Sequence, residues 1–551
     1  MSNSKASLTV VMAQIDLLVG DLRGNIERVV DSAERARDQL GAGLVVFPEL
    51  TLTGYPPEDL LLRPEFVAAA EAAVDEVRAR VAGVDLVVGH PVWEQAGLYN
   101  AASWLSNGEV RARYRKMLLP NYAVFDEKRY FQAGDQACVI QVDGFSLGIT
   151  ICEDIWQPEP AAQSKAAGAE VLLNLNASPY GLDKMGEREE VIRRRVDETG
   201  MPIVYVNLVG GQDELVFDGG SLVMGADGVV LRRTVQFDQT LVPIQMRRDA
   251  NAVVIARGEI APTPSQEETV YRAIVMGVRD YVGKNGFPGV VLGLSGGIDS
   301  ALTLAIAVDA LGADRVLAVM MPSRYTADMS NSDALAQCRL LAVAHKTLPI
   351  EPAFETFLDM LAPVFGDAPV DATEENIQAR CRGILLMAIS NKSGRMVLST
   401  SNKSETAVGY STLYGDMAGG FAPIKDVPKT LVYRLADYRN SRSPAIPQRV
   451  IDRPPSAELR PDQTDQDSLP PYEVLDAILH RFVELDWSTQ RIVAEGYESE
   501  VVERVARLVI LNEYKRRQAA PGVRITPRAF GRDRRYPITS GFRGSVPTGS
   551  E

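Results

Sequence analysis

Histidine is scarce in this sequence, with only three in 551 residues. They stand at His90, His345 and His480. We therefore expect no metal centre built from several histidines, and a cysteine nucleophile here would need a base other than histidine. Cysteine is scarce as well, and the four thiols are Cys138, Cys152, Cys338 and Cys381. Their spacing is typical of neither a zinc site nor a disulfide framework, so we expect a reducing, cytoplasmic environment.

Long apolar runs are also missing. We find no stretch long enough to span a bilayer, and the first residues lead into a strand pattern without the apolar core of a signal peptide. Basic residues are outnumbered, with 58 Lys and Arg against 72 Asp and Glu and a net charge of -14. This balance argues against nucleic-acid or membrane partners and favours an enzyme that binds small molecules at local sites. The length and the 46% hydrophobic content predict two or more globular domains.

A loop of small residues in the second half lacks the lysine of a Walker phosphate loop, whose pattern is G-x-x-x-x-G-K-[ST]. Residues 290–294 form an apolar run typical of a buried strand, and a helical pattern at 301–311 follows the segment S-G-G-I-D-S at 295–300. A strand, a small-residue loop and a helix start form the geometry that binds phosphate through backbone N–H groups. The segment S-G-G-x-D-S resembles the pyrophosphate loop of the ATP pyrophosphatases.

Strand and helix patterns alternate along the first half. Strand patterns at 8–13, 43–47 and 85–89 alternate with helical patterns at 21–40 and 64–82, which predicts an α/β layered fold. Residues 258–266 contain two prolines and no periodicity. We therefore expect a first domain at 1–258, a linker at 259–266 and a second domain at 267–551.

Three segments of the first half carry residues suited to catalysis. Glu49 ends a strand in F-P-E-L-T-L-T-G-Y, Lys116 lies in Y-R-K-M-L-L-P-N-Y, and Cys152 follows an apolar strand in L-G-I-T-I-C-E-D-I-W. Taken alone, a cysteine after an apolar strand is more often inert core, and a single Glu or Lys is usually solvated. In this order and spacing, the three resemble the Glu-Lys-Cys triad of the nitrilase superfamily.

Amide hydrolysis by a thiol needs these residue types. Glu49 would take the thiol proton and later activate water, and Lys116 would lower the pKa of the thiol and stabilise the oxyanion. We expect Glu127 to be a supporting carboxylate near the triad. The resemblance implies a nitrilase-like glutaminase domain with an α-β-β-α sandwich. It also implies that three residues hold the glutamine substrate: Tyr122, Ser178 and Lys184.

The second half repeats the order strand, helix, strand. Strand patterns at 315–321, 347–350 and 395–400 alternate with helical patterns, which predicts a doubly wound parallel sheet. Ligands of such sheets bind outside the carboxyl ends of the strands. The loop at 293–300, Thr400 and Glu405 all fall at such ends.

Five motifs in this half make the resemblance specific. They are S-G-G-I-D-S, E-E-N-I-Q-A-R, S-T-S-N-K-S-E, Y-G-D-M-A-G-G-F and N-E-Y-K-R-R-Q. Together they resemble the NAD synthetases, whose fold is of the ATP pyrophosphatase (adenine nucleotide α-hydrolase-like) type. With the nitrilase-like half in front, nearly the whole chain resembles the glutamine-dependent NAD(+) synthetases.

The resemblance implies a set of ligands for the second half. Asn376, Glu405 and Lys515 would contact deamido-NAD, and Asp299 and Glu405 would hold Mg²⁺, a hard ion that prefers oxygen ligands. The sequence does not say which role of Glu405 dominates, and Asn376 and Lys515 have an ordinary reading as helix-surface residues. The residues implied to contact ATP are Gly293, Leu294, Ser295, Gly296, Gly297, Ile298, Asp299, Ser300 and Thr400.

The implied reaction is the last step of NAD biosynthesis. ATP would adenylate deamido-NAD, and ammonia from glutamine hydrolysis would then give NAD, AMP, pyrophosphate and glutamate. The resemblance further implies a homo-oligomer, at least a dimer through the second domain, and a mobile cover over the site at the Pro-rich residues 439–472. Two rival hypotheses are a glutamine-fed adenylating enzyme with another acceptor and an inactive metabolite sensor.

Overall fold

The computed structural model describes residues 6–94, 96–249, 252–461 and 463–541. The chain forms two compact units, residues 1–263 and 264–551. The division after Thr263 falls within the segment 259–266. In the described part of the chain, no helix is long and apolar enough to cross a membrane.

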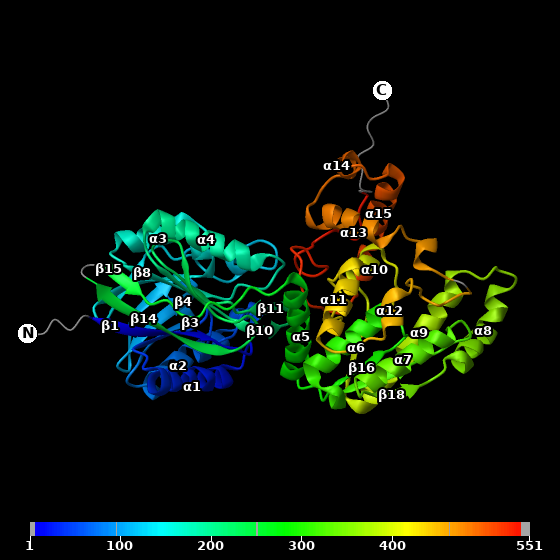
Figure 1. Ribbon diagram of the computed structural model, residues 1–551, viewed down its shortest axis with the longest axis horizontal. Helices are drawn as coiled ribbons and strands as arrows, with labels where there is room; N and C mark the ends of the chain where they lie inside the picture. The colour runs from blue at the N-terminus through cyan, green and yellow to red at the C-terminus, as the bar shows by residue number, and fades with distance from the viewer. Residues whose placement is uncertain (1–5, 95, 250–251, 462, 542–551) are drawn as a thin grey trace, which may run out of the picture. The chain divides into compact units, whose positions relative to one another are not determined.

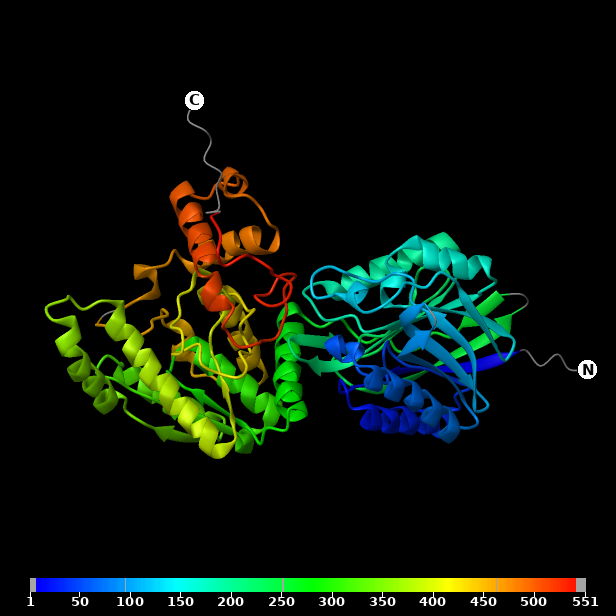
Figure 2. The same ribbon diagram turned by 180° about the vertical axis from the view of Figure 1, so that it is seen from behind.

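Two large sheets build unit 1 (Figure 1, and Figure 2 from behind). In the first sheet, the central strands β1, β2 and β3 are parallel, and antiparallel strands extend both edges. The order across this sheet is β15 (Ala252–Ile255), β14 (Thr240–Asp249), β1 (Ser7–Gln14), β2 (Leu44–Val46), β3 (Asp85–Glu94), β4 (Gly97–Ser106) and β5 (Glu109–Arg115).

The second sheet has a parallel centre of β7, β8 and β9. Its order is β13 (Val230–Arg233), β12 (Leu222–Met224), β9 (Ile203–Asn207), β8 (Val171–Asn176), β7 (Phe145–Ile151) and β6 (Cys138–Val142). A separate hairpin pairs β10 (Val209–Gln212) with β11 (Leu215–Asp218).

Alternation along the strands explains the layers. On β1, Val10 and Met12 enter the core between the two sheets, while Val11 and Ala13 enter the core beneath α1 (Leu22–Leu40) and α2 (Pro64–Arg80). On β8, Leu173 faces the first sheet and Leu172 packs with α3 (Pro158–Ala166) and α4 (Lys184–Thr199). Helices therefore cover both outer faces, and the predicted α-β-β-α sandwich is confirmed (Figure 1).

A four-stranded parallel sheet forms the centre of unit 2. Its order is β18 (Ala344–Thr347), β17 (Val316–Met320), β16 (Val290–Gly293) and β19 (Met396–Leu398). The chain runs outward from β16 to β18 and then returns to the other side of β16 with β19. The loops that follow β16 and β19 therefore meet at a topological switch point, as expected for a doubly wound sheet.

Helices surround this sheet and continue beyond it. Those of the sheet region are α5 (Gln266–Lys284), α6 (Ile298–Leu311), α7 (Asp328–Leu340), α8 (Glu351–Phe365), α9 (Ala372–Ser393), α10 (Lys403–Val408), α11 (Lys429–Arg442) and α12 (Gln448–Asp452). The later ones are α13 (Tyr472–Leu479), α14 (Thr489–Ala494), α15 (Ser499–Leu511) and α16 (Glu513–Arg516), and the first three share an apolar core with α10.

Two sequence predictions differ from the structure. The strand expected at 347–350 lies earlier, because Ala344–Thr347 is an exposed edge strand without the apolar pattern that marks a core strand. The long loop expected at 439–472 contains the end of α11, all of α12 and a 3-10 turn at Asp465–Asp467. Short helices of this kind have too few turns to give a periodic signal.

Candidate active sites

Glu49 is the buried centre of the first site. It follows β2, and its side chain is fully buried. Its Oε1 accepts hydrogen bonds from Nζ of Lys116 at 2.7 Å and Nδ2 of Asn100 at 2.8 Å. Its Oε2 accepts from the backbone N–H of Ala177 at 3.2 Å. Three donors in all fix this carboxylate in one orientation.

Lys116 bridges two carboxylates. Its Nζ donates to Glu49 and, at 2.8 and 2.9 Å, to both oxygens of Glu127, which also accepts from the hydroxyl of Tyr55 at 2.9 Å. Burial alone would lower the pKa of Lys116, but Glu127 and Glu49 outweigh it and raise the pKa well above its usual value. Lys116 is therefore a buried permanent cation. Burial is also the main cause that raises the pKa of Glu127 to about 7.

Cys152 lies at a sharp turn where β7 ends. Its φ is 44°, in the left-handed region that a non-glycine residue adopts only at some cost. Burial is the main cause that raises the pKa of its thiol well above the usual value, Glu49 adds to this, and Lys116 opposes it. These interactions bring Cys152 together with Glu49, Lys116 and Glu127, as the sequence predicted. A thiol with a raised pKa is protonated at rest and needs a base to become a nucleophile.

The residues expected to hold glutamine surround this turn. Tyr122, more than half exposed, donates from its hydroxyl to both oxygens of Glu153 at 2.9 and 3.1 Å. Nζ of Lys184 lies 4.2 Å from the ring centre of Trp156 and 2.9 Å from Glu187. Lys184 also lowers the pKa of Glu153, although burial raises that pKa overall. Glu153 is thus an acceptor beside the nucleophile that the sequence prediction did not name.

Ser178 is held from behind by Arg188. Nε of Arg188 donates to Oγ of Ser178 at 3.2 Å, and Nη2 of Arg188 donates to the Ser178 carbonyl at 2.8 Å. The same guanidinium is almost fully buried and pairs with Asp218 at 2.9 Å. Asn207 accepts the Ser178 N–H at 2.9 Å. The Ser178 segment is therefore rigid, and its N-terminal neighbour Ala177 donates to Glu49.

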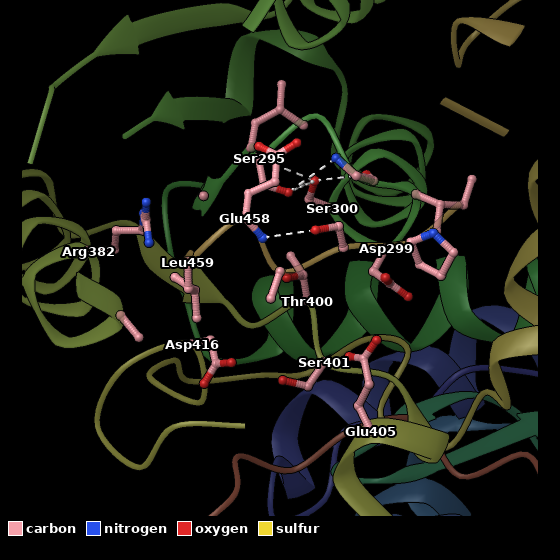
Figure 3. A pocket seen from close by; sticks show the side chains of 18 of the residues that line it. Ser295, Asp299, Ser300, Arg382, Thr400, Ser401, Glu405, Asp416, Glu458 and Leu459 are labelled. Carbon is pink, nitrogen blue, oxygen red and sulfur yellow. Dashed lines mark hydrogen bonds between the residues drawn. The ribbon is translucent and has the colours of Figure 1, made fainter. Parts of the chain in front are cut away.

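A pocket of about 270 Å³ forms the second site (Figure 3). It opens at the carboxyl ends of β16 and β19. The predicted residues that line it are Gly293, Leu294, Ser295, Gly297, Ile298, Asp299, Ser300, Thr400 and Glu405. Within the predicted loop, Oγ of Ser300 lies 3.1 Å from Oγ of Ser295 and donates to the Gly297 carbonyl at 3.0 Å. The hydroxyls therefore close the loop on itself and leave a compact cradle at the start of α6.

Gly296 does not line this pocket, although it belongs to the loop. Its φ is +83°, and a Cβ built on it would lie 2.3 Å from the carbonyl oxygen of Ser330. Only glycine fits there, because the loop packs directly on the start of α7. Gly296 therefore has a structural reason to be glycine, independent of any ligand.

Lys429 joins the two carboxylates that were expected to hold Mg²⁺. Its Nζ lies 2.5 Å from Oδ2 of Asp299 and 2.9 Å from Oε1 of Glu405. Asn402 donates to the other oxygen of Asp299 at 2.8 Å and accepts the N–H of Glu405 at 3.0 Å. One cation thus reaches both carboxylates, so the donor set fits a hard metal ion in spacing and chemistry. Among the described residues, no group of three or more His, Cys, Asp or Glu side chains forms a metal site.

Asn376 and Lys515 lie outside the pocket lining. Asn376 accepts from the hydroxyl of Thr412 at 2.7 Å, and Nζ of Lys515 donates to the carbonyls of Gly409 and Ser411 at 2.8 Å each. Residues 409–416 include Tyr410, Gly415 and Asp416, which do line the pocket. Both predicted residues therefore support one wall of the site from behind.

Part of the expected cover lies across the pocket. Residues 453–459 and Asp465 line it. Oε1 of Glu458 accepts from Oγ of Ser330 at 2.6 Å, and Nε2 of Gln378 donates to the Leu459 carbonyl at 2.9 Å. Figure 3 shows Glu458 and Leu459 among the side chains that line the pocket, together with Ser295, Asp416 and Glu405. Side-chain contacts thus tie this segment to α7 and α9.

Comparisons with known proteins give the family. Residues 9–250 match the carbon-nitrogen hydrolase family, and residues 270–519 match the NAD synthase family. The glutamine-dependent NAD(+) synthetase of Xanthomonas campestris pv. campestris (strain 8004) is 53% identical over 553 residues, which cover 98% of each chain. The chain belongs to the glutamine-dependent NAD(+) synthetases.

Other glutamine-dependent NAD(+) synthetases are similar over the same length. That of Aquifex aeolicus (strain VF5) is 44% identical over 97% of this chain and 100% of its own. The solved structure of the Acinetobacter baumannii enzyme in complex with adenosine diphosphate is 46% identical, with a TM-score of 0.78 over 98% of this chain and 100% of that one. The Cytophaga hutchinsonii structure, 22% identical, shares the fold with a TM-score of 0.82 over 98% of each chain.

Family membership gives the activity. The chain is a ligase that forms NAD with glutamine as the nitrogen donor, as its near full-length relatives are named, and both the glutaminase and the synthetase domain are present. The rival hypotheses of another acceptor and of an inactive sensor find no support among these relatives. The relatives give the reaction, but the assignment of its steps to individual side chains follows from the geometry.

Proposed function

We propose that Cys152, Glu49 and Lys116 release ammonia from glutamine, with Glu127 as a supporting carboxylate. The observation that carries this is the shared ammonium of Lys116, which holds Glu49 and Glu127 in one buried cluster beside the thiol. Glu49 takes the proton of Cys152, and the thiolate attacks the side-chain amide carbon of glutamine. Lys116 stabilises the oxyanion, and the proton on Glu49 leaves with ammonia. Water, activated by Glu49, then hydrolyses the thioester to glutamate.

Glutamine is recognised by charges on either side of the turn. The carboxylate of Glu153, held by Tyr122, suits the α-ammonium group of the substrate. Lys184 suits its α-carboxylate, and the rigid Ser178 segment supplies further polar contacts. A cation and a carboxylate on the same side of the thiol suit the two charged ends of a free amino acid.

The second site adenylates deamido-NAD with ATP. Residues 293–300 and Thr400 form a cradle of backbone N–H groups and hydroxyls that suits the phosphates, and the solved structure of the Acinetobacter baumannii relative in complex with adenosine diphosphate supports nucleotide binding in this family. The nicotinate carboxylate attacks the α-phosphorus, pyrophosphate leaves, and ammonia then displaces AMP. Asn376, Glu405 and Lys515 contact deamido-NAD, beside the 409–416 wall to which Asn376 and Lys515 are hydrogen-bonded.

Asp299 and Glu405 are the residues that would hold Mg²⁺. Bound there, the ion would offset the negative charge of the phosphates. Lys429 contacts both carboxylates and offsets part of their negative charge.

The second unit carries a surface suited to a second copy of the chain. Five large apolar side chains on the neighbouring helices α8 and α9 are exposed: Phe357, Met360, Val364, Ile384 and Met387. An apolar surface of this kind is typical of a homodimer interface. It supports at least a dimer through the synthetase unit. The cytoplasm is the compartment that suits the reaction and the four thiols, which are free in the structure.

Cys152→Ala tests the assignment of the nucleophile. We expect loss of glutamine-dependent NAD synthesis and full retention of ammonia-dependent synthesis, measured on the same preparation. Cys138→Ala, a matched change at a second thiol on the strand β6 that pairs with β7, should keep both activities. Glutamine-dependent synthesis by the Cys152→Ala variant in ammonia-free buffer would refute the nucleophile.

A further inference from the structure

Asp154 is a fully buried carboxylate with four hydrogen-bond donors around it. Its Oδ1 accepts from the backbone N–H groups of Met117 at 3.1 Å and Leu118 at 2.9 Å. Its Oδ2 accepts from the hydroxyl of Tyr114 at 2.7 Å and from the backbone N–H of Ile151 at 2.9 Å. Both oxygens are therefore fully used, which is the arrangement that makes a buried charge tolerable.

These donors come from two segments that the chain places far apart in sequence. Met117 and Leu118 directly follow Lys116, in the segment after β5 of the first sheet. Ile151 is the last residue of β7 and directly precedes Cys152. Asp154 itself lies two residues after Cys152, in the 3-10 turn at Cys152–Ile155. One carboxylate thus ties the backbone beside the catalytic cation to the backbone beside the thiol.

We propose that Asp154 is a positioning residue that sets the place of Lys116 relative to Cys152. The inference rests on the proposed glutaminase roles of Lys116 and Cys152. Asp154 acts through the protein, because it is fully buried and both its oxygens accept hydrogen bonds from neighbouring residues. Its effect is geometric: it holds the oxyanion-stabilising ammonium at a fixed distance from the carbon that the thiolate attacks.

Other groups constrain the two segments less directly. Tyr114 contributes only one of the four bonds, and the N–H of Lys116 itself donates to the Asn100 carbonyl at 2.8 Å within the first sheet. The Tyr114 bond reaches the Cys152 turn only through Asp154 itself, and the Lys116 N–H bond stays within the first sheet. Burial is the main cause that raises the pKa of Asp154 to about 6, while Ile151, Tyr114 and Lys116 favour its charged form. At neutral pH the acceptor form is therefore present.

Two substitutions separate positioning from folding. Asp154→Asn keeps the size but places an N–H₂ group against two donors, and Asp154→Glu keeps the charge but adds one methylene between the turn and residues 117–118. We expect both to lower the glutamine-dependent kcat about 10²-fold, the loss typical of a displacement near 1 Å, with KM for glutamine within about threefold. Tyr114→Phe, which removes one bond of four, should lose far less.

Ammonia-dependent synthesis by the second unit serves as the internal control and should stay unchanged in all three variants. The second readout is alkylation of Cys152 by iodoacetamide, followed by mass spectrometry across pH 6–10. Because Lys116 lowers the pKa of the thiol, its displacement should shift the midpoint of the Cys152 alkylation profile upward. A merely structural role would lower the amount of active protein without moving that midpoint.

The outcomes are distinct. Wild-type kcat and an unmoved alkylation midpoint in Asp154→Glu would overturn the proposal. Cys138 reports on folding, because it is half-buried in the folded unit. If Cys138 in both Asp154 variants were alkylated as fast as in a denatured control, Asp154 would be needed for folding alone, and the proposal would also be overturned. If Cys152→Ala kept glutamine-dependent synthesis, the nucleophile assignment would fail instead, whatever the Asp154 variants did.

Discussion

The Nζ atom of Lys429 lies 2.5 Å from Oδ2 of Asp299, at the start of α6. The same atom contacts Glu405, and the lysine side chain is 2% exposed. A cation therefore already lies between the two carboxylates expected to bind Mg²⁺. Burial would lower the pKa of Lys429, but the two acids outweigh it and raise the pKa above its usual value.

Lys429→Met should destabilise the second unit and make its stability depend on Mg²⁺. Removing one partner of a buried ion pair leaves uncompensated charge and costs about 3–5 kcal/mol. We expect a lower Tm than for Lys392→Met, at an exposed lysine near the end of α9, and a larger recovery of Tm on addition of Mg²⁺. Equal Tm values for the two variants, with or without Mg²⁺, would contradict this arrangement.

The apparent affinity for Mg²⁺ should weaken as the pH falls through 7. Burial is the main cause that raises the pKa of Glu405 to about 7, Lys429 opposes it, and Asp299 adds to it. Below this pH a proton competes with the metal for the carboxylate, so the affinity should drop by up to about tenfold per pH unit. Mg²⁺ titrations of ammonia-dependent synthesis at pH 6, 7 and 8 measure this apparent affinity. An affinity that is constant over this range would rule out Glu405 as a ligand.

Gly296→Ala should disrupt the phosphate cradle, whereas Gly297→Ala should fold normally. The added Cβ would lie 2.3 Å from the Ser330 carbonyl at position 296, where φ is +83°, but 3.4 Å from its nearest atom at position 297. Tm without nucleotide compares the two variants directly. We expect a clear loss for Gly296→Ala alone, and a similar Tm for both would show that the loop moves away from α7 at little cost.

Glu153→Gln should raise KM for glutamine without affecting ammonia-dependent synthesis. A hydrogen bond to a charged group contributes about 1.5–3 kcal/mol, so KM should rise about tenfold to a hundredfold. Glu159→Gln, at an exposed residue in the first turn of α3, is the matched control. A wild-type KM in the Glu153 variant would remove this carboxylate from the glutamine site.

Much of the fold was predictable because it depends on local patterns. The apolar run that became β16, the small-residue loop and the following helix appear in sequence order, so their geometry could be inferred from adjacent residues. The cluster of Glu49, Lys116, Glu127 and Cys152 was predicted as well, and the structure brings these residues together. Glu49 and Cys152 could be placed at strand ends, and the resemblance to the nitrilase superfamily implied Lys116 and Glu127.

The remaining contacts depend on tertiary structure. Lys429 begins a helix 130 residues after Asp299, and nothing in its neighbouring residues distinguishes it from a surface lysine. Asp154 and Asn402 lie in segments that the sequence did single out, but their partners come from distant elements. Asn376 and Lys515 contact hydroxyl and carbonyl groups of residues 409–412, which their own segments do not indicate, and their contact with deamido-NAD stays a prediction.

In the turn after β7, three consecutive residues need three different kinds of side chain. Position 152 needs a thiol, the half-buried position 153 needs a negative charge, and position 154 needs two buried acceptor oxygens. Insertion or deletion of a single residue here would exchange these roles at once, since each side chain would move to its neighbour's direction. We therefore expect active variants of the enzyme to keep the length of this turn. Insertions or deletions here should inactivate the glutaminase site even where single substitutions are tolerated.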